Sequence, residues 1–186
     1  MTEYPDKELF SRLAGGAILA DKREFMKQTI IAVINQKGGV GKTTTAVSLA
    51  AQLASAQTPV LLVDLDPQGN ATSGLGLAKE QLHPTSYEVL FGQVSLAQAI
   101  QSANREGLYI LPANAELDAA EVELVGQENR EFALKQAILI GAYHYVIIDC
   151  PPALGLLTIN ALTAAHSILI PVQSEYYALE GLGQLL

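Results

Sequence analysis

The eleven residues from Asn35 to Thr45, Asn-Gln-Lys-Gly-Gly-Val-Gly-Lys-Thr-Thr-Thr, constrain the fold of this chain more than any other stretch. They follow an apolar run, Ile30 to Ile34, and open an alanine-rich helical pattern from Thr43 to Ala56. A strand, a glycine-rich turn and a helix in this order predict a phosphate-binding loop, because the backbone N–H groups of the turn and of the helix N-terminus face one anion. A turn that only joins a strand to a helix is disfavoured, since it needs neither the two lysines nor the hydroxyl run.

The side chains of this loop predict a site for a nucleotide and Mg²⁺. We expect Lys42 to reach the outer phosphates and Thr43 to offer its hydroxyl to the metal. Gly38 should matter sterically, because a side chain there would crowd the phosphates or a facing chain. The residues expected to bind the nucleotide are Lys37, Gly38, Gly39, Val40, Gly41, Lys42, Thr43 and Thr44.

The loop departs from the ordinary pattern G-x-x-x-x-G-K-[ST] at its first position. Gln36 stands where the first glycine would be, and a second lysine, Lys37, follows it. This is the deviant Walker A pattern, and the chain here resembles the ParA/MinD family of ATPases. The resemblance implies that Lys37 reaches across a dimer interface to the nucleotide of the partner chain, which makes Lys37 and Lys42 candidate catalytic residues.

Two acids follow a second apolar run. The run from Pro59 to Val63 reads as a buried strand, and Asp64 and Asp66 come directly after it. Carboxylates at this end of a strand in an open α/β sheet either bind ligands or cap the next turn, and the sequence alone leaves both open. The run from Val63 to Gly76 resembles the ParA/Soj branch of the family. That resemblance implies that Asp66 positions and activates the attacking water, with Asp64 beside it as a candidate metal ligand.

A third strand ends in an acid. The run from Tyr145 to Asp149 is followed by Cys150-Pro151-Pro152, which matches the D-x-P-P element of the same family. Hydrophobic residues that close on an aspartate form a Walker B-like element, whose carboxylate holds a water of the Mg²⁺ shell. Asp149 therefore joins Thr43 and Asp64 as a candidate metal ligand, whereas Cys150 is expected to be a small core residue.

Strands alternate with helices along the chain, which predicts a three-layer α/β fold with a mostly parallel sheet, the P-loop NTPase fold. The expected strands span 29–34, 59–63, 108–111, 145–149 and 167–172. The expected helices span 43–56, 86–91, 95–102, 116–126, 129–140 and 154–165, with one more from Glu175.

The two ends of the chain differ from its middle. Residues 1–28 read as an N-terminal extension, disordered or arising from a misassigned start, with Met26 as an alternative first residue. Residues 29–186 read as the ATPase domain. Because the sequence stops inside a helical pattern with no stop signal, we expect a fragment that lacks the C-terminal strands and helices of the family.

Composition limits the location and the partners. The single cysteine fits a reducing compartment, and the chain shows no signal peptide and no transmembrane segment, so we expect a cytoplasmic protein without stable membrane insertion. The net charge of −8 is unlike that of a typical nucleic-acid binder. Any DNA-binding surface must therefore be small or lie outside these residues.

The resemblance implies a partition ATPase. ATP would close a homodimer that binds DNA non-specifically at the nucleoid, and a ParB-like activator would stimulate slow hydrolysis while chromosome or plasmid DNA is segregated. The alternatives are a MinD-like membrane-cycling regulator, an ATPase that positions protein clusters, or a binding module without turnover. A nitrogenase-iron-protein-like reductase is disfavoured, because one cysteine cannot hold a cluster.

Two polar features have simpler interpretations. His83, which precedes a proline, reads as a surface residue rather than a ligand, and His166 reads as structural. The acids of the 116–126 helix form a negative face that we interpret as a solvated surface.

Overall fold

The computed structural model describes residues 28–138 and 143–173. Within them, strands and helices alternate around one six-stranded sheet of order β3-β4-β2-β5-β1-β6. The pairings of β1 with β5 and β6, and of β2 with β4 and β5, are parallel, and only β3 runs antiparallel to its neighbour β4. The predicted three-layer α/β fold with a mostly parallel sheet is confirmed.

The central strands are short and almost fully apolar, which suits burial on both faces. The strands are β1 (Thr29–Val33), β2 (Val60–Asp64), β3 (Gln101–Ser102), β4 (Leu108–Leu111), β5 (Tyr145–Asp149) and β6 (Ser167–Leu169). Because successive side chains of a strand point to opposite faces, β1, β2, β4 and β5 each contribute to both hydrophobic clusters of the core. In β2, for example, Leu61 and Val63 lie in one cluster and Leu62 in the other.

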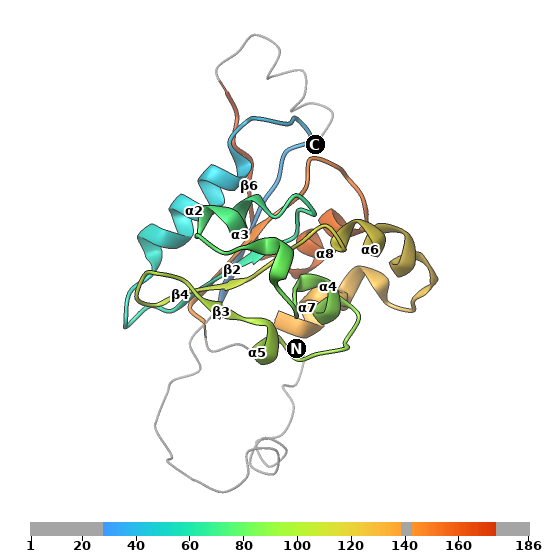
Figure 1. Cartoon of the computed structure of the whole chain (residues 1–186). Coiled ribbons are helices and arrows are strands. Elements are labelled where there is room, and N and C mark those ends of the chain that lie inside the picture. Colours follow the sequence, from blue (N-terminus) through green and yellow to red (C-terminus); the bar gives the residue numbers. More distant parts are fainter. Residues whose placement is uncertain (1–27, 139–142, 174–186) are drawn as a thin grey trace, which may run out of the picture.

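Helices cover both faces of the sheet. One face is covered by α2 (Lys42–Leu53) and α3 (Asn70–Gly74), and Ala46 and Ala50 of α2 are fully buried in its cluster. The other face is covered by α4 (Ser86–Leu90), α5 (Leu96–Ala99), α6 (Leu117–Glu123), α7 (Ala133–Ile138) and α8 (Leu156–Ala164). Figure 1 shows α2 and α3 on one side of the strands and α6, α7 and α8 on the other.

Short 3₁₀ turns complete the connections, and some expected boundaries move. The turns are η1 (Lys79–Gln81), η2 (Leu124–Gly126) and η3 (Arg130–Phe132). The helix expected over 95–102 ends at Ala99, and its last part forms the edge strand β3 instead. The N-terminal extension and the helix expected from Glu175 lie outside the described residues. Among those that are described, no helix is long and apolar enough to cross a membrane.

Glu121 joins two of the helices that cover the second face. Its carboxylate accepts hydrogen bonds from the backbone N–H groups of Leu156 (2.7 Å) and Leu157 (3.2 Å), at the N-terminus of α8. The N–H groups of the first helical turn have no acceptor within the helix, so the carboxylate supplies one. A carboxylate there also interacts favourably with the helix dipole. The interpretation of the α6 acids as a solvated face is therefore wrong for Glu121, which fixes the helix that follows Asp149.

Candidate nucleotide-binding site

The parallel register brings the three sequence motifs to one edge of the sheet. In the β1–β5 pair Val33 lies opposite Asp149, and in the β2–β5 pair Asp64 lies opposite Asp149. Strands β2, β5 and β1 are neighbours and all run in the same direction. The glycine-rich loop after β1 and the acids at the ends of β2 and β5 therefore emerge side by side, where open α/β sheets bind ligands.

The glycine-rich loop is held open in front of α2. Gly39 (φ 74°) and Gly41 (φ 89°) adopt left-handed backbone conformations that other residues rarely reach. Hydrogen bonds fix the loop from behind: the Asn35 side chain accepts from the N–H of Lys37 (2.9 Å) and donates to the carbonyl of Pro171 (2.9 Å). A Cβ at Gly38 would meet no atom of the described chain within 4 Å. The described residues therefore do not crowd Gly38, and the prediction that a side chain there would meet the phosphates or a facing chain stays untested.

The start of α2 carries the features of an anion site. Gly41 caps the helix without a side-chain hydrogen bond, and the first turn of α2 contains no acid, so no carboxylate competes for its N–H groups. Lys42 is only 7% exposed. Its Nζ donates to the carbonyl oxygen of Lys37 at 3.3 Å, which places the ammonium group beneath the loop. Thr43 is half-buried and Thr44 is exposed in the same turn.

Asp149 is a fully buried carboxylate at the end of β5. It is 0% exposed, and neither oxygen makes a hydrogen bond of ordinary geometry within residues 28–138 and 143–173. Burial raises the pKa of Asp149 to about 7, and the nearby Asp64 and Asp66 carboxylates add to the rise. The neighbouring Thr43 hydroxyl and the Lys42 ammonium group oppose it.

The environment of Asp149 shows whether the residues of this site suit Mg²⁺. A buried polar group without a partner is costly, and carboxylates and hydroxyls are the hard oxygen donors that Mg²⁺ and its bound waters require. An unpaired carboxylate beside the Thr43 hydroxyl fits the ion. Thr43 and Asp149 are therefore the two residues best placed to hold it.

Both carboxylate oxygens of Asp64 accept hydrogen bonds from neighbouring residues of the chain. Its Oδ2 accepts hydrogen bonds from the backbone N–H (2.8 Å) and the hydroxyl (2.7 Å) of Thr72, and its Oδ1 accepts from the N–H of Asp66 (3.2 Å). Burial raises the pKa of Asp64 to about 6, although the bonds from Thr72 favour the charged form. Of the two interpretations that the sequence leaves open, the structure supports the cap of the following turn. The expectation that Asp64 binds the metal remains a prediction.

Asp66 lies on a tightly held loop. It is 7% exposed, its Oδ1 accepts from the N–H of Gln68 at 2.9 Å, and its carbonyl oxygen accepts from the N–H of Gly69 at 2.8 Å. The Lys79 ammonium group donates to the carbonyl of Gln68 and ties the loop from the other side. The sequence analysis did not identify Lys79 and Thr72 as residues that hold this loop. Their partners, Gln68 and Asp64, lie eleven and eight residues away, and only the folded turn brings them together.

Gly69 gives a direct test of this loop. It has φ 58°, and a Cβ there would lie 2.8 Å from the carbonyl oxygen of Ala113. We expect Gly69→Ala to lower the free energy of unfolding by about 2–4 kcal/mol, from the left-handed backbone and the collision together, as measured by urea denaturation. Gly126→Ala is the matched control, because a Cβ there meets nothing within 4 Å. Equal stability of the two variants would contradict the described loop.

Cys150, next to Asp149, is a core residue as predicted. It is fully buried, and burial raises the pKa of its thiol, so the neutral form persists. A buried thiol that stays neutral is a poor nucleophile, which agrees with the expected role in the core.

The chain matches known proteins over almost all of its described part. An AAA domain family model matches residues 28–186. The chain is 57% identical over 158 residues to the chromosome partitioning protein ParA of Myxococcus xanthus, covering 84% of this chain and 56% of that protein. It is 56% identical over 159 residues to the sporulation initiation inhibitor protein Soj of Bacillus subtilis, covering 84% of this chain and 63% of that protein.

Solved structures agree with the fold. A cobyrinic acid a,c-diamide synthase from Mycobacterium smegmatis, solved with an ATP analogue and magnesium, has a TM-score of 0.81 and 48% identity, covering 85% of this chain and 65% of that chain. A putative plasmid partition protein from Borrelia burgdorferi bound to AMPPNP has a TM-score of 0.75 and 32% identity, covering 86% and 67%.

The chain spans 56% and 63% of the lengths of the two curated relatives named above. The matched stretch covers 84% of this chain and therefore spans the positions of the deviant Walker A loop, the acids after β2 and the D-x-P-P element. On the family match, the chain belongs to the AAA domain family, and within its matched region it is similar to the ParA and Soj proteins named above.

Proposed function

We propose that this chain is the nucleotide-binding part of a partition ATPase that binds ATP with Mg²⁺ and hydrolyses the ATP. The observation that carries the proposal is the buried carboxylate of Asp149, which makes no hydrogen bond of ordinary geometry among the described residues. It lies near Lys42 and Thr43, which begin the helix after the glycine-rich loop. A buried carboxylate without an ordinary hydrogen bond and a helix N-terminus without a side-chain cap, in one place, suit a cation and an anion that bind together.

Each residue of the site has a separate proposed role in ATP binding or hydrolysis. Bound Mg²⁺ neutralises charge on the β- and γ-phosphates of the nucleotide. Thr43 and Asp149 hold the ion, and the N–H groups of the loop and the Lys42 ammonium group bind the phosphate oxygens. Asp66 accepts a hydrogen bond from a water molecule and orients it toward the γ-phosphate. Charge neutralisation and a positioned water are what phosphoryl transfer to water requires.

The proposal includes a switch between two assembly states. Lys37 lies at the exposed front of the loop, and family resemblance places the matching lysine across a dimer interface. A nucleotide that binds the dimer better than the monomer shifts the equilibrium to the dimer, and hydrolysis withdraws that bias. We propose that the ATP-bound dimer binds DNA non-specifically in the cytoplasm, at the nucleoid, and that a ParB-like activator stimulates slow turnover during segregation of chromosome or plasmid DNA.

Light scattering coupled to gel filtration tests the switch. The Asp66→Ala variant, which should not turn ATP over, is run with Mg-ATP and with Mg-ADP. We expect a dimer mass with ATP and a monomer mass with ADP. Replacing Lys37 by alanine in the same background should return the ATP sample to the monomer, whereas Arg105→Ala, at an exposed turn before β4, should leave it dimeric. The same mass in both nucleotides would contradict the switch.

A further inference from the structure

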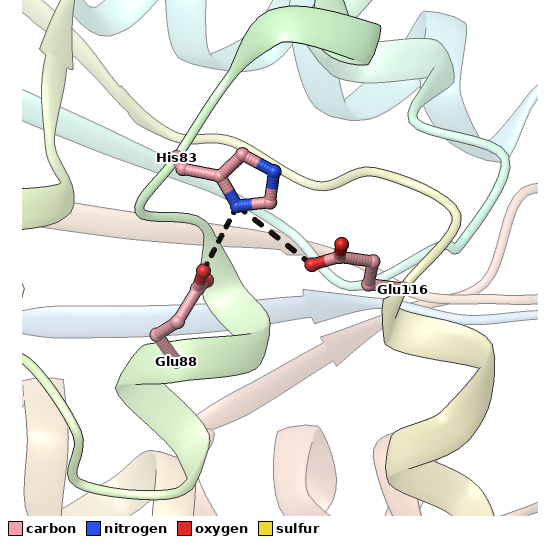
Figure 2. Close-up of side chains that lie close together, drawn as sticks. All are labelled: His83, Glu88 and Glu116. Atoms are coloured by element: carbon pink, nitrogen blue, oxygen red, sulfur yellow. Dashed lines mark hydrogen bonds and ion pairs between the residues drawn. The ribbon is translucent and has the colours of Figure 1, made fainter.

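Three side chains with metal-binding atoms converge on the loop side of α4. His83 precedes α4, Glu88 lies within it, and Glu116 immediately precedes α6. Figure 2 shows both carboxylates on the same side of the His83 ring, with its Nδ1 facing both of them. The Nδ1 lies 3.0 Å from Oε1 of Glu88 and 3.7 Å from Oε2 of Glu116. One ligand atom from each residue lies within 4.8 Å of the other two.

Hydrogen bonds outside the cluster hold its members in place. The second oxygen of Glu88 accepts from the N–H (2.7 Å) and the hydroxyl (2.8 Å) of Thr85, which leaves Oε1 directed at His83. The amide of Asn114, only 6% exposed, donates to the carbonyl of Leu82 (3.3 Å) and accepts from the N–H of Glu116 (3.1 Å). Asn114 thus ties the backbone beside His83 to that of Glu116. Outer partners that orient ligand side chains in this way are typical of metal sites.

The spacing suits a small transition-metal ion. With Zn–N and Zn–O bonds of about 2.0–2.2 Å, neighbouring ligand atoms in a tetrahedral site lie about 3.3–3.5 Å apart. The separations of 3.0 and 3.7 Å from Nδ1 bracket this range. One imidazole nitrogen with two carboxylate oxygens is a donor set for Zn²⁺ and its neighbours, whereas Mg²⁺ and Ca²⁺ prefer oxygen alone.

An ion pair between His83 and Glu88 explains the arrangement less completely than a metal site does. His83 and Glu88 could pair without Glu116, whose side chain is 55% exposed and could turn away from a second carboxylate. Two carboxylates aimed at one nitrogen repel each other, and a divalent cation offsets that repulsion more than one imidazolium charge does. We propose that His83, Glu88 and Glu116 form a binding site for a divalent transition-metal ion of the zinc type, with waters completing its coordination.

Calorimetric titration of the full chain with ZnCl₂ tests the proposal, without nucleotide and with Mg²⁺ in excess to occupy the acids of the P-loop edge. The sequence holds only three histidines and one cysteine, and the cysteine is buried, so strong competing donors are few. We expect one zinc ion per chain. His83→Gln and Glu116→Gln should each weaken its binding at least 10-fold. Glu106→Gln, which removes an exposed acid elsewhere, should leave it unchanged.

Cobalt supplies a spectroscopic check that does not depend on heat signals. Co²⁺ bound to the wild-type chain should show the visible absorption that is typical of cobalt with a low coordination number. That absorption should disappear in His83→Gln and persist in the Glu106→Gln control. Far-ultraviolet circular dichroism of the variants confirms that they are folded. Zinc affinity that is the same in wild type, His83→Gln and Glu116→Gln would overturn the proposal and leave the cluster as an ion pair. Neither result bears on the proposed ATPase, because none of its residues takes part.

Discussion

Lys42→Ala is expected to abolish nucleotide binding. Lys42 is only 7% exposed, and its ammonium group donates to the carbonyl oxygen of Lys37 in the loop, so another cation would not readily take its place at the phosphates. Losing a charge-assisted contact of this kind costs about 3 kcal/mol, which corresponds to at least ~100-fold weaker binding of Mg-ATP. Isothermal titration calorimetry with a non-hydrolysable ATP analogue measures the change.

Lys79→Ala is an informative comparison for this variant. Lys79 also donates to a backbone carbonyl near the site, that of Gln68, but it lies on the Asp66 loop rather than under the phosphate loop. Its loss should leave the affinity for the analogue within a few-fold of wild type. If Lys42→Ala bound the analogue as tightly as Lys79→Ala does, the glycine-rich loop would not be the phosphate site.

Asp66→Ala is expected to separate binding from turnover. Its carboxylate is placed to orient a water molecule, and removing a general base or a water-positioning group typically lowers the rate by about 10²–10⁴-fold. The affinity for Mg-ATP should stay near wild type, because no proposed phosphate or metal contact is removed. Single-turnover phosphate release, measured beside analogue binding, gives both quantities.

Asp66→Asn sharpens that test. Asparagine keeps an oxygen that can accept from the N–H of Gln68, so the loop should keep its conformation while the carboxylate charge is lost. We expect it to be as slow as Asp66→Ala and as stable as wild type. Undiminished phosphate release in either variant would move the water-positioning role to another residue.

The sequence predicted the parts of the fold and the site that depend on local pattern. The apolar runs that became β1, β2 and β5 are followed by the glycine-rich loop or end in an acid, and parallel pairing then brings those ends together. The family and the α/β sheet are therefore confirmed. The structure brings several of the predicted site residues to one edge of the sheet, but their individual roles stay predictions.

What the sequence could not predict depends on contacts between distant residues. Asp64 and Asp149 both end apolar strands. Hydrogen bonds from Thr72 and from the N–H of Asp66 make Asp64 a turn cap, whereas Asp149 has no hydrogen bond of ordinary geometry among the described residues. A capping pattern at Ser95 correctly predicted a helix, but the partner strand β4 turns Gln101 and Ser102 into an edge strand.

The acids of α6 show the same limit. Helical spacing places them on one face and suggests exposure to solvent. Glu121, however, meets the start of α8, and Glu116 meets His83, because α6 packs beside α8 and α4. No pattern within the 116–126 segment carries this information.

Nucleotide-dependent binding to double-stranded DNA tests the central claim most directly. Fluorescence anisotropy of a labelled duplex is measured with Mg-ATP and with Mg-ADP, at about 50 and 200 mM salt, with the Asp66→Ala variant to prevent turnover. We predict binding only with ATP, and weaker binding at the higher salt, because contacts to phosphates release counterions. No binding in either nucleotide, from a protein that nevertheless dimerises with ATP, would contradict a DNA-partition role and favour a membrane or protein-cluster cargo.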